Sequence, residues 1–154
     1  MKRILHISLL IAALLCITTT TYAADREHTL KVYNWADYID ESLLDEFVIW
    51  YKEQTGEEVE IIYQLFDINE VMLAKLEKGH EDFDVVCPSE YIIDRMLASD
   101  MLLPINRDFG TTPDYTSLVS PFFVEQLAKF DQDGKQANDY AVGYMWGTTG
   151  ILYN

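Results

Sequence analysis

The sequence has little cysteine, histidine and positive charge, and each shortage excludes a class of protein. Its 154 residues include two cysteines and three histidines, and the histidines are too scattered for a metal-binding pattern. It contains no glycine-rich phosphate loop, nucleophile elbow or zinc motif. Lys and Arg number 11 against 26 Asp and Glu, so the net charge is −15 at pH 7. Because phosphate contacts need Lys and Arg, we expect no nucleic-acid partner, and cations suit this surface better.

The first 23 residues have the pattern of a secretory signal peptide. Two basic residues precede the apolar run 4–17, which is too short to span a bilayer comfortably. Residues 21–23 offer a small-x-small cleavage site. The alternatives are an uncleaved membrane anchor and a lipoprotein anchored at Cys16, although the bulky Leu15 disfavours the lipoprotein. We therefore expect residues 24–154 to lie outside the cytoplasm.

Removal of the signal peptide makes the remainder more acidic and leaves it one cysteine. Two basic residues and no acidic residue leave with positions 1–23, so the net charge becomes −17. Cys87 cannot form an internal disulfide in 24–154, and we interpret it as a small buried hydrophobic side chain in a strand. We predict no cofactor and no metal site. The acidic run from Asp131 fails the calcium-loop pattern because Gly134 stands fourth instead of sixth.

Strand and helix signals alternate along the chain, which predicts an α/β fold with a parallel sheet and right-handed crossovers. Ser42 and Asp45 suit a capping box, Gly56 and Gly79 suit helix ends, and Asn69 can cap a helix. The expected strands are 29–34, 58–65 and 83–87, the last buried on both faces. The expected helices are 42–54, 70–78, 89–98 and 121–130. In the first we expect one apolar face formed by Leu43, Phe47, Trp50 and Tyr51. In the second we expect Val71, Met72, Leu73 and Leu76 to point inward. We expect a loop over 109–120, a turn at 131–134 and extended chain at 140–146 and 151–153.

Two segments with unusual side chains follow predicted strands. Residues 34–38 follow the first strand and 88–91 follow the third. In parallel sheets ligands bind outside the carboxyl ends of the strands, so this topology brings both segments to one edge. We expect a binding site there.

The candidate ligand residues of the first segment are Trp35, Asp37 and Tyr38, which offer two aromatic faces and a carboxylate. Aromatic faces attract cations, and a carboxylate pairs with an ammonium group. The pattern therefore favours a site for a cation with an apolar body. The alternatives are that both rings fill the core and that Asp37 is a solvated turn residue.

The candidates of the second segment are Ser89, Glu90 and Tyr91. Ser89 is also a favourable N-cap, and its hydroxyl could do only that. Glu90 is favourable in a first helical turn for the helix dipole. With Asp37, the Glu90 carboxylate would make this edge attractive to cations, against the usual preference of helix amino ends for anions.

Five motifs occur in the order found in one known family: residues 32–39, 72–76, 83–89, 94–96 and 144–151. On these motifs the chain resembles the spermidine/putrescine-binding periplasmic proteins of ABC transporters. The resemblance implies a type II periplasmic-binding fold of two α/β lobes joined by a hinge, with 24–154 as an incomplete amino-terminal lobe. It also implies capture of a polyamine, spermidine or putrescine, in the periplasm and delivery to a membrane permease.

The resemblance also implies roles for the candidate residues. The aromatic pair matching Trp35 and Tyr38 sandwiches the carbon chain of the polyamine, and the acid matching Asp37 meets an amine. Positions matching Ser89 and Tyr91 line the cleft, and the acids for the other amines lie in later sequence. Three positions depart from the family pattern: Ala36, Glu90 and Cys87. The first two leave the preferred polyamine open, and we expect no consequence from Cys87.

Two other functions are compatible with the sequence. One is a binder of the same fold for another small solute, such as a sugar, an amino acid or a metal. The other is a secreted hydrolase that uses Asp82 or Asp84, which flank Phe83 as a catalytic acid pair could. No oriented base or nucleophile accompanies these carboxylates, so we expect no enzyme.

Overall fold

The structure is a computed structural model that describes residues 26–79, 81–105, 119–147 and 150–151. The predicted signal peptide, the predicted loop apart from its last two residues, and the end of the predicted extended segment at 151–153 lie outside the described residues. Within the described segments, none of the helices combines the length and the hydropathy that a membrane crossing requires.

A three-stranded parallel sheet organises the amino-terminal part of the chain. It consists of β1 (Thr29–Trp35), β2 (Glu60–Phe66) and β3 (Val85–Val86) in the order β2-β1-β3. Trp35 pairs with Phe66, and Tyr33 pairs with Val86. The first two strands lie within two residues of the predicted bounds, and the predicted parallel α/β topology is confirmed.

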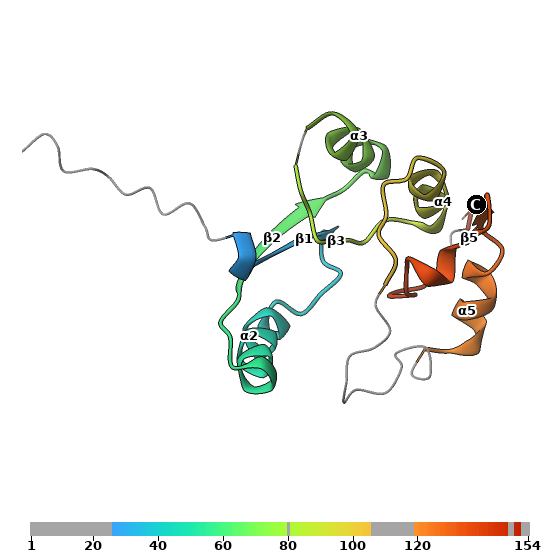
Figure 1. Ribbon diagram of the computed structural model, residues 1–154. Coiled ribbons are helices and arrows are strands. Elements are labelled where there is room, and N and C mark those ends of the chain that lie inside the picture. The colour runs from blue at the N-terminus through green and yellow to red at the C-terminus, as the bar shows by residue number, and fades with distance from the viewer. Residues whose placement is uncertain (1–25, 80, 106–118, 148–149, 152–154) are drawn as a thin grey trace, which may run out of the picture.

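The helices that connect the strands lie on opposite sides of the sheet (Figure 1). They are α2 (Ser42–Thr55) and α3 (Asn69–Gly79). The chain leaves β1 toward β2 and then returns past β1 to β3, so its direction across the sheet reverses. Right-handed crossovers therefore place the two helices on opposite faces. The next helix, α4 (Glu90–Ala98), follows β3.

Most of the buried apolar side chains lie between the sheet, α3 and α4. This core contains Tyr33, Phe66, Met72, Leu73, Ile92 and Met96. The Tyr33 ring stacks on Phe83 at a centroid distance of 4.7 Å and meets Phe66 edge-on at 5.1 Å. This core therefore holds the sheet against α4, which carries the second candidate segment.

A smaller group of elements follows α4: α5 (Pro121–Leu127), β4 (Asp131–Gln132), β5 (Lys135–Gln136) and a 3-10 turn, Ala137–Asp139. Leu97 of α4 is buried with Leu127 and Ala137. The predicted turn at 131–134 is confirmed, with Asp133 and Gly134 in the left-handed region between β4 and β5. Residues 140–146, predicted to be extended, form neither strand nor helix.

Two predictions about α2 are wrong. Its N-cap is Glu41, not Ser42, and the Asp40 Oδ1 atom accepts a hydrogen bond from the Ser42 backbone N–H at 3.1 Å. Its predicted apolar face does not enter the core: no residue of α2 is buried, and Leu43 is 49% exposed. Instead, Phe47 contacts Trp50 and Tyr51 one turn further along the same helix. The prediction that Gly56 ends this helix is confirmed, with φ 79°.

Three predictions near α3 and β3 also need correction. Val71 is 60% exposed rather than inward, whereas Met72 and Leu73 are buried as predicted. β3 covers only two residues, and Val85 is 48% exposed, so the strand is not buried on both faces. The Asp84 carboxylate accepts the Lys31 backbone N–H at 2.8 Å, which replaces a ladder bond and delays the start of β3. Cys87 is partly rather than fully buried.

Candidate functional site

The segments that follow the three parallel strands meet at the carboxyl ends of the strands, which we call the carboxyl edge. β1 leads to Trp35, Asp37 and Tyr38, β2 leads to Asn69, and β3 leads to Ser89. Because all three strands run in the same direction, these segments lie along one edge of the sheet. The candidate residues therefore share the location that the sequence predicts for them.

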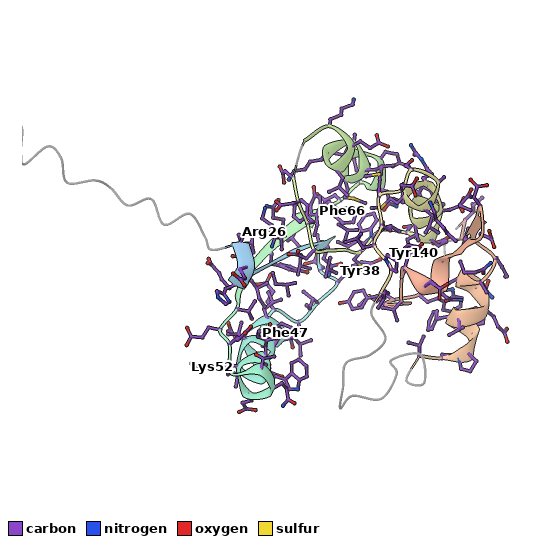
Figure 2. All side chains as sticks on the ribbon, viewed as in Figure 1. Arg26, Tyr38, Phe47, Lys52, Phe66 and Tyr140 are labelled. Atoms are coloured by element: carbon purple, nitrogen blue, oxygen red, sulfur yellow. The ribbon has the colours of Figure 1, made fainter. Side chains whose placement is uncertain are left out.

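Trp35 lies partly in the core and partly at the surface. Its ring centroid is 4.7 Å from that of Phe66 and 6.0 Å from that of Tyr38. Tyr38 is 40% exposed, and Figure 2 shows it on the side of the sheet toward the carboxyl-terminal elements. The alternative in which both rings fill the core is wrong for Tyr38 and only partly right for Trp35.

A buried amide fixes the end of β1. Asn34 is 4% exposed, and its Oδ1 atom accepts the Trp35 backbone N–H at 2.8 Å. Its Nδ2 atom donates to the Tyr63 hydroxyl at 2.9 Å. Burial raises the pKa of Tyr63, so this phenol stays neutral and available as a hydrogen-bond partner at neutral pH. Sequence reasoning missed this pair because the two residues stand 29 positions apart.

Asp37 is exposed at the start of the turn after β1, with φ 60°. Asp and Asn tolerate this left-handed conformation better than most residues. In the described part of the chain its carboxylate has no ion-pair partner. A solvated carboxylate that stands between two aromatic residues in the sequence can receive an ammonium group without first breaking a salt bridge.

Ser89 and Tyr91 are connected through Asn69. The Asn69 Nδ2 atom donates to the Ser89 hydroxyl and to the Tyr91 hydroxyl, each at 2.9 Å, and the Tyr91 hydroxyl donates to Glu70 Oε1 at 3.0 Å. Ser89 stands at the N-cap position of α4, but its side chain makes no capping bond. The alternative in which this hydroxyl only caps the helix is therefore wrong, and so is the predicted cap at Asn69, which is the first residue of α3.

Glu90 and Tyr91 are both exposed on the first turn of α4. Tyr91 is 43% exposed despite its hydrogen bonds. Glu90 adds negative charge beside it but takes no part in the Asn69 network. The carboxylates of Asp37, Glu70 and Glu90 thus all belong to segments at the carboxyl edge, which favours a cation.

Tyr144 reaches the same edge from the carboxyl-terminal part of the chain. Its hydroxyl donates to the backbone oxygen of Tyr38, 106 residues away in sequence. Its side chain is 48% exposed. This contact ties the turn after β1 to residues beyond α5, and no local pattern in the sequence could reveal it.

The acid pair considered for a hydrolase has a different role. The Arg26 guanidinium donates to Asp82 at 2.6 Å and to Asp84 at 2.7 Å, and Lys31 donates to Asp82 at 2.6 Å. The hydrogen bonds from Lys31, which has the largest effect, and from Arg26 hold the pKa of Asp82 well below its usual range. The cluster lies before β3 and near the start of β1, away from the carboxyl edge. Both carboxylates are engaged as structural ion-pair partners.

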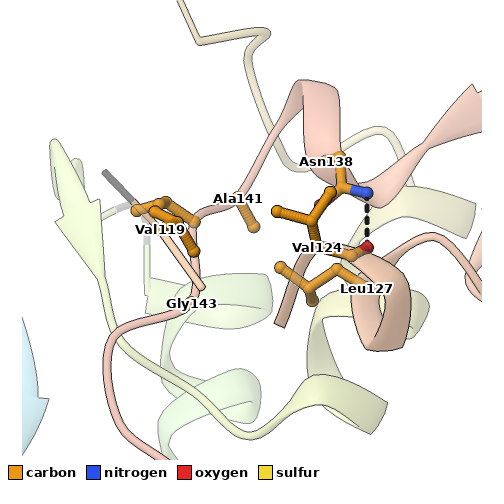
Figure 3. Close-up of a pocket in the computed structure, with 7 residues that line it drawn as sticks. Val119, Val124, Leu127, Asn138, Ala141 and Gly143 are labelled. Atoms are coloured by element: carbon orange, nitrogen blue, oxygen red, sulfur yellow. Dashed lines mark hydrogen bonds between the residues drawn. The ribbon is translucent and has the colours of Figure 1, made fainter. Parts of the chain in front are cut away.

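Two hollows in the described structure lie away from the carboxyl edge. One pocket of about 10 Å³, shown in Figure 3, is lined by Val119, Val124, Leu127, Asn138, Ala141, Val142 and Gly143, and it has room for about one water molecule. An open groove of about 590 Å³ lies between the end of α2 and the start of β2. Among the described residues no three His, Cys, Asp or Glu side chains form a metal-binding group. Burial raises the pKa of Cys87, the one cysteine among the described residues, to about 11, which disfavours a nucleophilic role.

Comparison with known proteins points to one group of binding proteins. A solved structure described as a putative spermidine/putrescine ABC transporter from Listeria monocytogenes superposes with a TM-score of 0.58 and is 34% identical, covering 78% of this chain and 33% of its own. The described fold is therefore an α/β lobe of the periplasmic-binding-protein class. No protein-family model matches the chain.

The curated relatives that match the chain have the names of polyamine-binding proteins. The putrescine-binding periplasmic protein PotF of Escherichia coli K12 is 36% identical over 95% of this chain, and the spermidine/putrescine-binding periplasmic protein of the same strain is 34% identical over 95%. SpuD, a putrescine-binding periplasmic protein of Pseudomonas aeruginosa, is 33% identical over 86%. The resemblance to the periplasmic spermidine/putrescine-binding proteins, first seen in the motifs, is thereby confirmed. The chain spans 32–38% of the length of these relatives.

Proposed function

We propose that this chain is the amino-terminal lobe of an extracytoplasmic solute-binding protein that captures spermidine or putrescine. In this proposal residues 1–23 direct export to the periplasm, and 24–154 supply one wall of a ligand cleft. A second lobe, joined by a hinge, supplies the other wall, and the closed protein delivers its ligand to the membrane permease of an ABC transporter. The relatives carry names of periplasmic polyamine-binding proteins rather than enzymes, which supports a binding role.

The observation that carries the proposal is the group formed by Trp35, Asp37 and Tyr38. The two ring centroids lie 6.0 Å apart, and the carboxylate between them in sequence is exposed. A polyamine is a polycation with apolar methylene segments. Rings can pack on the methylenes and attract the ammonium groups, while the carboxylate pairs with a charged end. Neither a sugar nor an amino-acid zwitterion needs such an excess of negative charge.

The direct test is calorimetric titration of the full-length protein with spermidine and putrescine, beside a panel of neutral sugars, amino acids and divalent cations. We expect micromolar or tighter binding of a polyamine and much weaker binding of the rest. Tight binding of a sugar, an amino acid or a metal in preference to both polyamines would overturn the proposal. Small-angle scattering with and without ligand tests the hinge, because capture should close the lobes and make the protein more compact.

A further inference from the structure

One buried amide holds both hydroxyl groups of the second candidate segment. Asn69 is 5% exposed, and its Nδ2 atom lies 2.9 Å from both the Ser89 Oγ and the Tyr91 Oη atoms. We infer that Asn69 is a positioning residue, which fixes how Ser89 and Tyr91 face the polyamine without touching the ligand itself. This inference rests on the proposed function and goes beyond it, because Asn69 is not one of the candidate ligand residues.

The orientation of the Asn69 amide follows from its surroundings. The backbone N–H of Ser89 can only donate, and it lies 3.2 Å from Oδ1. The oxygen must therefore face Ser89 N, and the two N–H groups of Nδ2 must face the hydroxyls. The amide is consequently locked by three bonds to α4 and its N-cap, and it cannot flip without placing a donor against a donor.

This arrangement dictates what the two hydroxyls can offer. Each accepts a hydrogen from Asn69, so each must direct its own proton elsewhere. Tyr91 donates to Glu70 Oε1 at 3.0 Å, which places that carboxylate beside the tyrosine. Ser89 keeps a lone pair for an ammonium N–H, and in the described part of the chain its proton has no side-chain acceptor. Asn69 thereby leaves oxygen lone pairs on both hydroxyls, and the Glu70 carboxylate is bonded to one of them; all of these groups suit a cation.

The same bonds join two segments that the sequence keeps apart. Asn69 begins α3 after β2, whereas Ser89 and Tyr91 stand 20 and 22 residues later at the start of α4. Without the amide, the first turn of α4 would keep its backbone but lose the bonds that fix the two side chains. The expected loss is therefore in ligand affinity rather than in fold.

The test is calorimetry with spermidine on full-length protein carrying Asn69→Ala, alone and combined with Ser89→Ala and Tyr91→Phe. We expect the single change to weaken binding about 10-fold, on the scale of one or two hydrogen bonds. In the Ser89→Ala/Tyr91→Phe background the same change should have an effect of about twofold or less, because the groups it positions are gone. Asn138→Ala is the matched control: Asn138 Nδ2 also bridges two segments, donating to Val124 O at 2.9 Å. That control should leave affinity unchanged.

Each result decides the question. Unchanged affinity in Asn69→Ala, or equal losses in both backgrounds, overturns the positioning role while leaving the proposed function intact. Failure of the parent protein to bind either polyamine overturns the proposed function and this inference with it. If Asn69→Ala does not fold, as judged by thermal melting, the two hydroxyl residues decide. The fold-loss of affinity in the Ser89→Ala/Tyr91→Phe double variant should be smaller than the product of the two separate fold-losses. Strictly multiplicative losses would contradict the shared amide.

Discussion

The Trp35 indole packs against the Phe66 ring with their centroids 4.7 Å apart, so the core supports it from behind. The two residues are also paired at the ends of β1 and β2. Phe66 is 5% exposed and anchors the contact, whereas Trp35 is only partly buried. A ring held in this way is preorganised for a ligand on its remaining face, which lowers the ordering cost of binding.

This relationship predicts that Trp35→Ala in the full-length protein weakens polyamine binding by about 10-fold or more, because the ligand loses an aromatic face worth about 1–2 kcal/mol. Calorimetry measures the loss. Trp50→Ala is the control, since Trp50 is 47% exposed on α2 and contacts Phe47 of the same helix. Equal affinities of Trp35→Ala and the parent would make Trp35 a core residue only.

Asp37 offers a test of charge at constant shape. Asn tolerates the same φ of 60°, so Asp37→Asn should fold normally and remove only the negative charge. We expect affinity for spermidine to fall about tenfold, since a hydrogen bond to a charged group contributes about 1.5–3 kcal/mol. Titrations at low and high salt should also show a weaker salt dependence than in the parent.

The control for that change is Asp133→Asn. Asp133 is another exposed aspartate with positive φ, 54°, in the turn between β4 and β5. Asp133→Asn removes a negative charge from the same backbone conformation as Asp37→Asn, but at a different place in the structure. If both variants lose affinity equally, the effect comes from net charge and Asp37 has no specific contact with the ligand.

The ion-pair cluster at the amino-terminal side of the sheet predicts a pH dependence of stability. Lys31 and Arg26 lower the pKa of Asp82 in the folded protein, so its contribution is present above the unfolded value of about 3.9. It is lost as pH falls through the lower folded pKa. Asp82→Asn should therefore lower the thermal midpoint at pH 7, and the difference from the parent should shrink below about pH 4. A difference that stays constant from pH 7 to pH 3 would exclude the ion pairs as its source.

The sequence predicted the parts of the fold that depend on local pattern. The apolar runs of β1 and β2 and the glycine after α2 are readable from neighbours in the chain, because backbone geometry and side-chain period act locally. The length of β3 could not be predicted from neighbouring residues, because Asp84 competes for the Lys31 backbone N–H from 53 residues away. The exposure of α2 was also missed, because the pairing of Phe47 with Trp50 and Tyr51 has the same spacing as a core-facing stripe.

The candidate site, too, could be predicted only in part from the sequence. Residue types and topology sufficed to bring Trp35 and Ser89 to one edge, since parallel strands end together. The support behind them was not predictable: Asn34 reads as an ordinary strand residue and Asn69 as a helix cap. Both turn out to be buried, at 4% and 5% exposure, with their amides bonded to residues 20 or more positions away. Polar groups that are buried need such partners, but sequence does not say which ones.

The division of the site between two lobes predicts that the 154-residue chain alone binds spermidine weakly. Micromolar affinity requires about 8 kcal/mol net, after the loss of translational and rotational freedom is overcome. Two aromatic contacts of about 0.5–2 kcal/mol each and one charged hydrogen bond of about 1.5–3 kcal/mol do not reach that value. Calorimetry on the chain and on the full-length protein should therefore give dissociation constants that differ by about 100-fold or more. Thermal melting of the chain establishes that it is folded during the titration, and tight binding by the folded chain alone would place the whole site in this chain.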